Sequence, residues 1–234
     1  MHPLDQLLQA QPRLWRGRQH PQGQRTEPSG NARLDAFLPG GGWPLGALTE
    51  LLTPPSGGGE FSLLMPSLKR LTAQQEWVAL VAPPWLPYPP ALARAGIDLS
   101  HLLVVQPDQP TEAAWATEQL LRSGGFRAVL AWLPRVSTTR LRRLQLAAEA
   151  GGDVWALVYR PESALGEASP AALRLHFSAA TSPEHGGPQL QVVKCRGDNP
   201  GSLLLGQRPR PTPHTEHTPA VGRRGMPQHA ANDG

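Results

Sequence analysis

The segment Thr49–Ser62 (TELLTPPSGGGEFS) decides how the fold of this chain is interpreted. An apolar run ends there in a glycine-rich turn, and the turn opens into the apolar residues 63–65. A strand followed by a glycine-rich turn and a helix is the arrangement that cradles phosphate groups in many α/β proteins. The segment therefore predicts an α/β fold, and it raises the question of whether a nucleotide binds at the turn.

The turn lacks the residues that would hold a nucleotide. The phosphate-loop pattern G-x-x-x-x-G-K-[ST] needs a lysine to neutralise the phosphates and a hydroxyl to ligate magnesium. Without gaps, the pattern places Thr53 at the first glycine, Gly58 at the second, Gly59 at the lysine and Glu60 at the hydroxyl. Two like charges ~4 Å apart repel by about 4 kcal/mol at an effective dielectric of ~20, so Glu60 opposes a phosphate. We expect a degenerate phosphate loop (Walker A) that binds no cofactor.

Strand-like and helix-like segments alternate along the chain on both sides of this turn. A nearly all-apolar run such as 77–82 (WVALVA) is typical of a strand buried on both faces. Residues 172–179 and 189–196 alternate in polarity and flank a turn, which predicts an antiparallel hairpin. Strands are expected at 47–52, 77–82, 102–106, 128–133 and 154–159, and helices at 61–73, 111–123 (capped by Thr111) and 137–150 (ended by Gly151). This alternation predicts a mainly parallel sheet with helices on both faces and an antiparallel C-terminal edge.

The composition of the chain limits its class. Its 234 residues suit one domain with tails, here an N-terminal arm (1–30, a short helix and a flexible linker), a core (31–205) and a disordered Pro/Gly-rich tail (206–234). The only cysteine, Cys195, excludes an internal disulfide and fits a reducing compartment. No apolar stretch approaches the roughly 18 residues of a membrane span, and no signal peptide is evident. We therefore expect a cytoplasmic protein without membrane contact.

No arrangement of residues points to catalysis or to a metal site. Cys195 has no histidine or second cysteine nearby, and neither paired carboxylates nor a Ser/His/Asp pattern stands out. The strand at 128–133 carries Trp132 where nucleotide-binding folds place the acid that holds magnesium. We expect no enzymatic activity and no bound metal.

Three sets of residues are candidates for partner binding. Trp15, Arg16 and Arg18 (WRGR) suit either a peptide anchor or an arm folded back on its own domain. The segment 83–90 offers Trp85 and Tyr88 either as a rigid recognition surface or, as we favour, as aromatics that cap the sheet. The third set is Arg140, Arg142 and Arg143, which suits DNA phosphates or an acidic partner, although a solvated helix face is the favoured interpretation. The net charge of +4 permits contacts with nucleic acid or acidic protein without requiring them.

Longer motifs resemble the RecA-like recombinases. Residues 34–62 are similar to the recombinase segment that leads into and through the phosphate loop, and 172–175 and 190–196 resemble its paired late strands. The resemblance implies a RecA-like three-layer core. The resemblance also aligns Lys194 and Arg196 with basic groups of the recombinases that reach ATP across a filament interface. Because we expect this chain to bind no ATP, these two residues are candidates only for contacts with a protein interface or with DNA.

The combination of WRGR, LPGGGWP (38–44), LVAPPWLPYPPAL (80–92) and SPAALRL (169–175) resembles the ImuA family, RecA-like proteins related to the cell-division inhibitor SulA. This resemblance implies a non-catalytic adaptor in SOS-induced, mutagenic translesion DNA synthesis after DNA damage. The implied partners are ImuB (an inactive Y-family polymerase), an error-prone C-family polymerase and RecA, with DNA contacted indirectly. The alternative is a SulA-type inhibitor of the division protein FtsZ, although SulA proteins are commonly shorter. An active ATPase or recombinase would need nucleotide binding despite Gly59 and Glu60.

Overall fold

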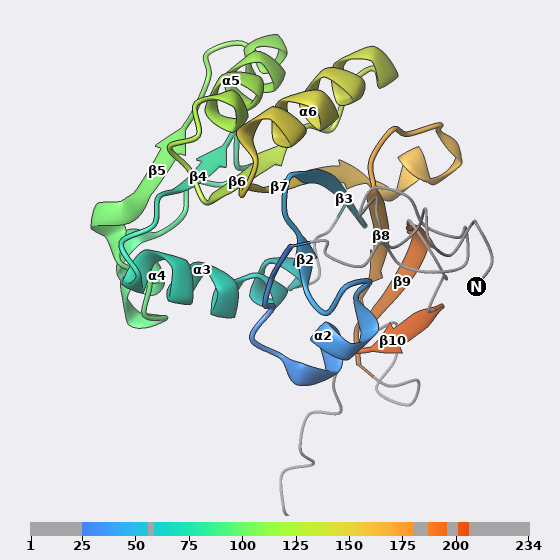
Figure 1. Cartoon of the computed structure of the whole chain (residues 1–234), viewed down its shortest axis with the longest axis horizontal. Coiled ribbons are helices and arrows are strands. Elements are labelled where there is room, and N and C mark those ends of the chain that lie inside the picture. Colours follow the sequence, from blue (N-terminus) through green and yellow to red (C-terminus); the bar gives the residue numbers. More distant parts are fainter. Residues whose placement is uncertain (1–24, 56–58, 180–186, 196–200, 206–234) are drawn as a thin grey trace, which may run out of the picture.

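A computed structural model describes residues 25–55, 59–179, 187–195 and 201–205 (Figure 1). Several predictions fall outside these ranges: the N-terminal helix, the WRGR residues Trp15, Arg16 and Arg18, Gly58, Arg196 and the tail 206–234. The division into arm, core and tail therefore stays a prediction. Among the described residues, no helix has the length and apolar character needed to cross a membrane.

An eight-stranded sheet forms the centre of the described structure, with the strand order β10-β9-β8-β3-β7-β6-β4-β5. The six strands from β8 to β5 in this order are mutually parallel, whereas β9 and β10 are antiparallel to their neighbours. The strands are β3 (Ala47–Thr53), β4 (Val78–Val81), β5 (Leu102–Val105), β6 (Ala128–Trp132), β7 (Trp155–Pro161), β8 (Leu173–Ser178), β9 (Gln189–Lys194) and β10 (Ser202–Leu204). The prediction of a mixed α/β fold with a mainly parallel sheet and an antiparallel edge is confirmed.

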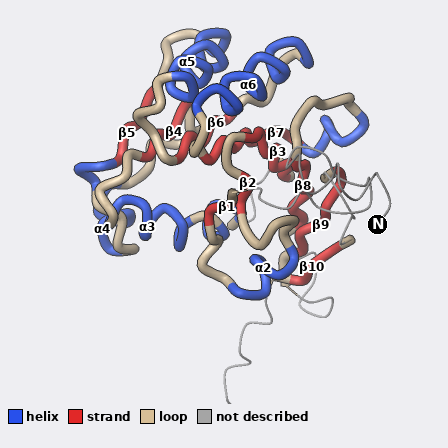
Figure 2. Tube along the Cα trace, viewed as in Figure 1, coloured by secondary structure: helices blue, strands red, loops and turns tan. Residues whose placement is uncertain are grey.

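Helices pack on both faces of the sheet, as Figures 1 and 2 show. On one face, Leu48 of β3 lies in an apolar cluster with Leu141 and Leu144 of α6. On the other face, Leu51 of the same strand lies in a cluster with Leu68 of α3. The first face carries α5 (Pro110–Arg122) and α6 (Thr138–Gly151), and the second carries α2 (Ala32–Phe37), α3 (Met65–Ala73) and α4 (Pro89–Arg94). Successive residues of β3 point to opposite faces, so both faces of this strand are buried, and the strand carries the polar residues Thr49 and Glu50 among its leucines.

A short N-terminal ribbon is fastened to this core by ion pairs. Its strands β1 (Thr26–Glu27) and β2 (Trp43–Pro44) pair with each other in antiparallel register. The buried Glu27 forms ion pairs with Arg70 of α3 and, at 3.2 Å, with Arg127 next to β6. Trp43 also stacks on Trp155 of β7, with ring centroids 5.3 Å apart. The ribbon is therefore part of the folded unit.

The ends of several helices differ from the predictions for physical reasons. Helix α5 begins at Pro110, and its N-cap is Gln109, so the prediction that Thr111 caps it is wrong. Proline is favoured in the first turn of a helix because it has no N–H group that needs a hydrogen-bond partner. Helix α6 includes Gly151 and ends at Gly152, whose φ of 75° only glycine adopts without strain. The predicted helix 61–73 is divided into a 3₁₀ turn, η1 (Glu60–Leu63), and α3.

Candidate functional site

From Gly59 onward, the described part of the connection from β3 to α3 differs from the geometry of a phosphate loop. Gly59 has a φ of 86° and leads into η1, whose first residue is Glu60. Helix α3 begins only at Met65, and its first turn contains Pro66, which has no N–H to offer a phosphate. In a phosphate loop the glycine-rich turn opens directly into an α-helix whose free N–H groups face the ligand. The interpretation of Thr53–Glu60 as a degenerate Walker A loop is therefore wrong.

Aromatic packing occupies the carboxyl ends of β6 and β7 beside this connection. Trp132 stacks on Tyr159, with ring centroids 4.5 Å apart and planes inclined by 6°, and Phe61 lies 6.2 Å from Trp132. The Tyr159 hydroxyl is buried and has no hydrogen-bond partner among the described residues. Burial, with a smaller contribution from the charge of Glu60, raises the pKa of Tyr159 well above its ordinary value. The ring cluster therefore stays uncharged and acts as packing.

Glu50 holds a surface loop against the sheet from inside the protein. Its fully buried carboxylate accepts hydrogen bonds from Nε of Arg174 at 2.6 Å and from Nη1 of Arg160 at 3.5 Å. Arg160 also pairs with Glu167 at 2.7 Å. Arg174 donates to the backbone carbonyls of Ala164 at 2.9 Å and Glu167 at 3.0 Å, in the segment that includes η3 (Glu162–Gly166). These contacts give the two arginines and Glu50 a structural role.

The basic residues of α6 are partly engaged within the protein. Arg140 donates from Nη1 to the carbonyl of Thr111 at 3.0 Å, and Arg143 pairs with the buried carboxylate of Glu118 at 2.8 Å. Both side chains thus reach α5 from one face of α6. Arg142 is exposed and forms no ion pair within the described ranges. Outside this helix, Lys194 donates from Nζ to the carbonyl of Ser169 at 2.7 Å.

The segment 83–88, here called the proline loop, displays its large side chains to solvent. Trp85, Leu86 and Tyr88 are 84%, 81% and 69% exposed, respectively. The favoured interpretation, in which the aromatics cap the sheet, is therefore wrong. The exposure that the alternative requires is present, and the recognition surface itself stays a prediction. Leu86 was not among the candidates from sequence, although its position between Pro84 and Pro87 of the same loop was an available signal.

The described residues contain no cluster of three or more His, Cys, Asp or Glu side chains able to hold a metal ion. Taken together, the geometry offers buried ion pairs, packed rings and one strongly exposed apolar loop. The interaction that this exposed loop offers is apolar contact.

The family model and the curated relatives that this chain resembles all carry the name SulA. A family model described as "Cell division inhibitor SulA" matches residues 56–154, which is less than half of the 234-residue chain. The SulA protein of Edwardsiella piscicida is 32% identical over 108 residues, an alignment that spans 46% of this chain and 64% of that protein. The SulA protein of Yersinia enterocolitica is 29% identical over 135 residues, spanning 57% of this chain and 80% of that protein. This chain thus spans less than two thirds of the Edwardsiella protein.

A search of solved structures found the crystal structure of SulA from Pseudomonas aeruginosa, with 28% sequence identity and a TM-score of 0.42. The superposition covers 48% of this chain and 97% of the Pseudomonas chain.

These sequence similarities overturn the resemblance to the ImuA family. The family model and the curated relatives carry the SulA name, so the expected role in translesion DNA synthesis is wrong. The expected partners ImuB, the C-family polymerase and RecA are wrong with it. Three of the four motifs behind the ImuA resemblance, WRGR (15–18), 38–44 and 169–175, lie outside the matched residues 56–154. Short glycine- and proline-rich motifs determine turns of the chain, and turns alone do not identify a binding partner.

Proposed function

We propose that this chain is a SulA-type cell-division inhibitor that binds the tubulin-like division protein FtsZ and blocks its polymerisation. The observation that carries the proposal is the similarity to the SulA family over residues 56–154. This region runs from the connection after β3 to the residue before β7, and it includes α3 to α6 with the proline loop. The alternative suggested by the sequence, inhibition of FtsZ, thus replaces the role in DNA synthesis.

The inhibitor acts by binding and not by catalysis. Glu50 is held by Arg160 and Arg174, and Trp132 and Tyr159 stack on each other, so these side chains are committed to structure. A binder that covers a surface needed by the next subunit removes one subunit from assembly for each molecule bound. The critical concentration of FtsZ therefore rises in proportion to the amount of inhibitor, which distinguishes this mechanism from an enzyme acting in trace amounts.

The partner-binding candidates from sequence remain proposals within this function. The proline-loop residues Trp85 and Tyr88 have the support of high exposure. The basic side chains Arg140, Arg142 and Arg143 are a secondary candidate surface, because Arg140 and Arg143 also hold α6 to α5. Lys194 lies beyond residues 56–154, so the match to the SulA family model does not support it.

The fold family and the cellular location of this chain are also proposals. We propose a RecA-like core, supported by the mainly parallel sheet with helices on both faces and antiparallel strands at one edge. We also propose action in the cytoplasm, where FtsZ assembles, supported by a composition with a single cysteine and no apolar span.

The test is assembly of purified FtsZ with GTP in the presence of the full chain, followed by light scattering and sedimentation. The expected result is loss of pelleted FtsZ that rises linearly with added chain and is complete near equimolar amounts. A complementary test is overexpression in a rod-shaped bacterium, where filamentation is expected. Unchanged assembly at a several-fold excess of the chain would remove the proposal.

A further inference from the structure

The proline loop carries the three most exposed large hydrophobic side chains of the described residues: Trp85, Leu86 and Tyr88. They lie within four consecutive positions, whereas the next most exposed, Trp115, is alone on α5. Single exposed hydrophobic residues are normal on protein surfaces, but a contiguous apolar group marks an interaction site. We propose that the proline loop is the anchor by which this chain docks into a shallow apolar cleft, rimmed by carboxylates, on its protein partner.

The loop is held in shape at both ends. At its start, the N–H of Ala82 donates to the carbonyl of Val105 at 2.8 Å, and Ala82 has a φ of 51°. A positive φ is uncommon for a residue with a side chain and persists only where surrounding contacts fix it. At its end, the carbonyl of Tyr88 accepts from the N–H of Ala91 at 3.0 Å, in the first turn of α4. The chain thus leaves the sheet and enters α4 at fixed points.

Prolines stiffen the backbone between these points. Pro83, Pro84 and Pro87 lie within the loop, and Pro89 and Pro90 begin α4. Each ring fixes its φ angle and restricts the residue before it, so few backbone conformations are lost when a partner binds. Trp and Tyr also lose little rotamer freedom for the area they bury, and both are enriched at the energetic centres of interfaces. The loop is therefore preorganised for binding.

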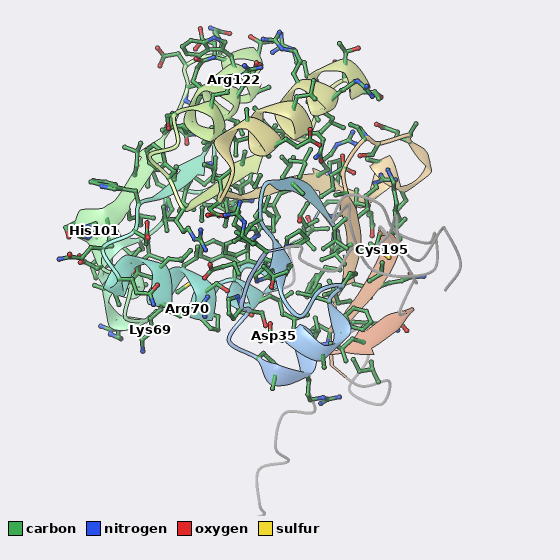
Figure 3. The ribbon with its side chains drawn as sticks, viewed as in Figure 1. Asp35, Lys69, Arg70, His101, Arg122 and Cys195 are labelled. Carbon is green, nitrogen blue, oxygen red and sulfur yellow. The ribbon has the colours of Figure 1, made fainter. Side chains whose placement is uncertain are left out.

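The charge around the loop defines the rim of the partner's cleft. Residues 77–97 contain no Asp or Glu, and Arg94 in the last turn of α4 is the cation of this segment. Lys69 of α3 packs against Gly96, where the missing Cβ leaves room for its side chain. Figure 3 shows Lys69 on the side of the molecule where α4 lies. The positive charges of Arg94 and Lys69, next to the exposed apolar side chains of the proline loop, are complementary to carboxylates next to an apolar cleft on the partner.

A lipid surface fits the same side chains less well than a protein does. Sequence segments that bind anionic membranes carry about 4–8 clustered Lys or Arg residues. Residues 77–97 contain one such cation, Arg94, and Lys69 packs against Gly96 of the same segment. Rigid fixation at both ends is also of no advantage in a fluid interface, whereas it lowers the entropic cost of fitting one defined cleft. A protein cleft is therefore the occupant that we infer.

The inference rests on the proposed function, because FtsZ is the partner on which it is tested. The dissociation constant of the full chain for FtsZ is measured for wild type and for the triple variant Trp85→Ala, Leu86→Ala, Tyr88→Ala. We expect the triple variant to bind at least about 30-fold more weakly, the effect of losing one or more energetic centres. The matched control is Trp115→Ala, which removes the same side chain from an exposed position on α5 and is expected to bind like wild type. Because these side chains are exposed, thermal unfolding of all variants should match that of wild type.

The outcomes distinguish failure of the docking role of the proline loop from failure of the proposed function as an FtsZ inhibitor. Wild-type binding that survives the triple substitution overturns the docking role of the loop and leaves the proposed function standing. Absence of wild-type binding overturns both. An equal loss of affinity for FtsZ in Trp115→Ala and in the triple variant also overturns the docking role. The affinity would then depend on exposed apolar surface in general and not on the proline loop. Co-sedimentation of wild type, but not of the triple variant, with vesicles containing phosphatidylserine, alongside unchanged FtsZ binding, would assign the loop to lipid instead.

Discussion

Glu50 of β3 and Arg174 of β8 form a buried ion pair, with Nε and Oε2 2.6 Å apart, although 124 positions separate them in the sequence. Arg160 of β7 reaches the same carboxylate from the opposite side of β3. The pair thus joins three neighbouring strands near the centre of the sheet. Glu50 lies in the interior of β3, and these contacts give its carboxylate a structural role.

Replacing Arg174 with methionine should therefore lower the free energy of unfolding strongly. The substitution leaves the buried carboxylate of Glu50 with Arg160 alone, at 3.5 Å, and breaking a buried pair typically costs about 3–5 kcal/mol. The measurement is urea-induced unfolding followed by circular dichroism. The control is Arg25→Met, which removes the exposed pair with Asp153 and should cost less than about 1 kcal/mol. Similar small losses for both variants would contradict the structural role assigned to the buried pair.

Glu167 should make stability fall in acid. The hydrogen bond and the charge of Arg160, with a smaller contribution from Arg174, lower the pKa of Glu167 from its ordinary value of 4.5. A carboxyl with a lowered folded-state pKa adds stability above its unfolded pKa, and that stability is lost as the pH falls through the folded value. Unfolding by urea is therefore compared for wild type and Glu167→Gln between neutral and acidic pH. The advantage of wild type should be present at neutral pH and shrink below pH 4.5; an advantage independent of pH would argue against the Arg160 contact.

The Tyr159 phenol should ionise only when the protein unfolds. Its pKa is raised well above the ordinary value because the hydroxyl is buried, with a further contribution from Glu60. The chain has two tyrosines, so the phenolate absorbance of wild type and Tyr159→Phe can be compared during an alkaline titration. The two proteins should absorb equally until near-ultraviolet circular dichroism reports loss of native packing. A second phenolate in native wild type would show that the hydroxyl reaches water.

The same substitution should not destabilise the fold. The Tyr159 hydroxyl has no hydrogen-bond partner among the described residues, so its removal eliminates a buried polar group that gains nothing from folding. The stacking of the ring on Trp132 is retained in phenylalanine. The free energy of unfolding of Tyr159→Phe should be unchanged or higher by about 1 kcal/mol. A loss of stability would indicate that the hydroxyl has a partner in solution.

Stiffness of the proline loop should contribute to affinity separately from its side chains. Pro87→Gly leaves Trp85, Leu86 and Tyr88 in place but increases the number of backbone conformations lost on binding. Such a change typically costs about 0.4–1 kcal/mol, so binding to FtsZ should weaken about two- to five-fold. Titration calorimetry should report this as a less favourable entropy. Affinity equal to wild type would mean that contacts outside the loop hold it in shape.

Much of the fold was accessible from sequence because the signal is local. The run at 77–82 had to be buried on both faces, and β4 occupies Val78–Val81 at an interior position in the sheet. The hairpin of β8 and β9 was likewise readable from two alternating segments around a turn. Strand β10 was not predicted, because Ser202–Leu204 is too short to show a period.

The features that decide the candidate site depend on contacts between distant residues. Sequence alone could not show that Glu50 meets Arg174, nor that Trp132 stacks on Tyr159. Proline spacing predicted the stiffness of the loop at 83–90, but the exposure of Trp85 depends on how Ala82 redirects the chain after β4. The ImuA resemblance failed for a related reason: glycine- and proline-rich motifs specify turns shared by many scaffolds, and the surface that a turn presents is determined by packing.

The most direct test of a stoichiometric FtsZ-binding inhibitor is sedimentation of GTP-assembled FtsZ at a fixed total concentration with increasing amounts of the full chain. We predict that pelleted FtsZ falls linearly and reaches its baseline near one chain per FtsZ. A pellet that stays constant through a several-fold molar excess of chain would contradict the account.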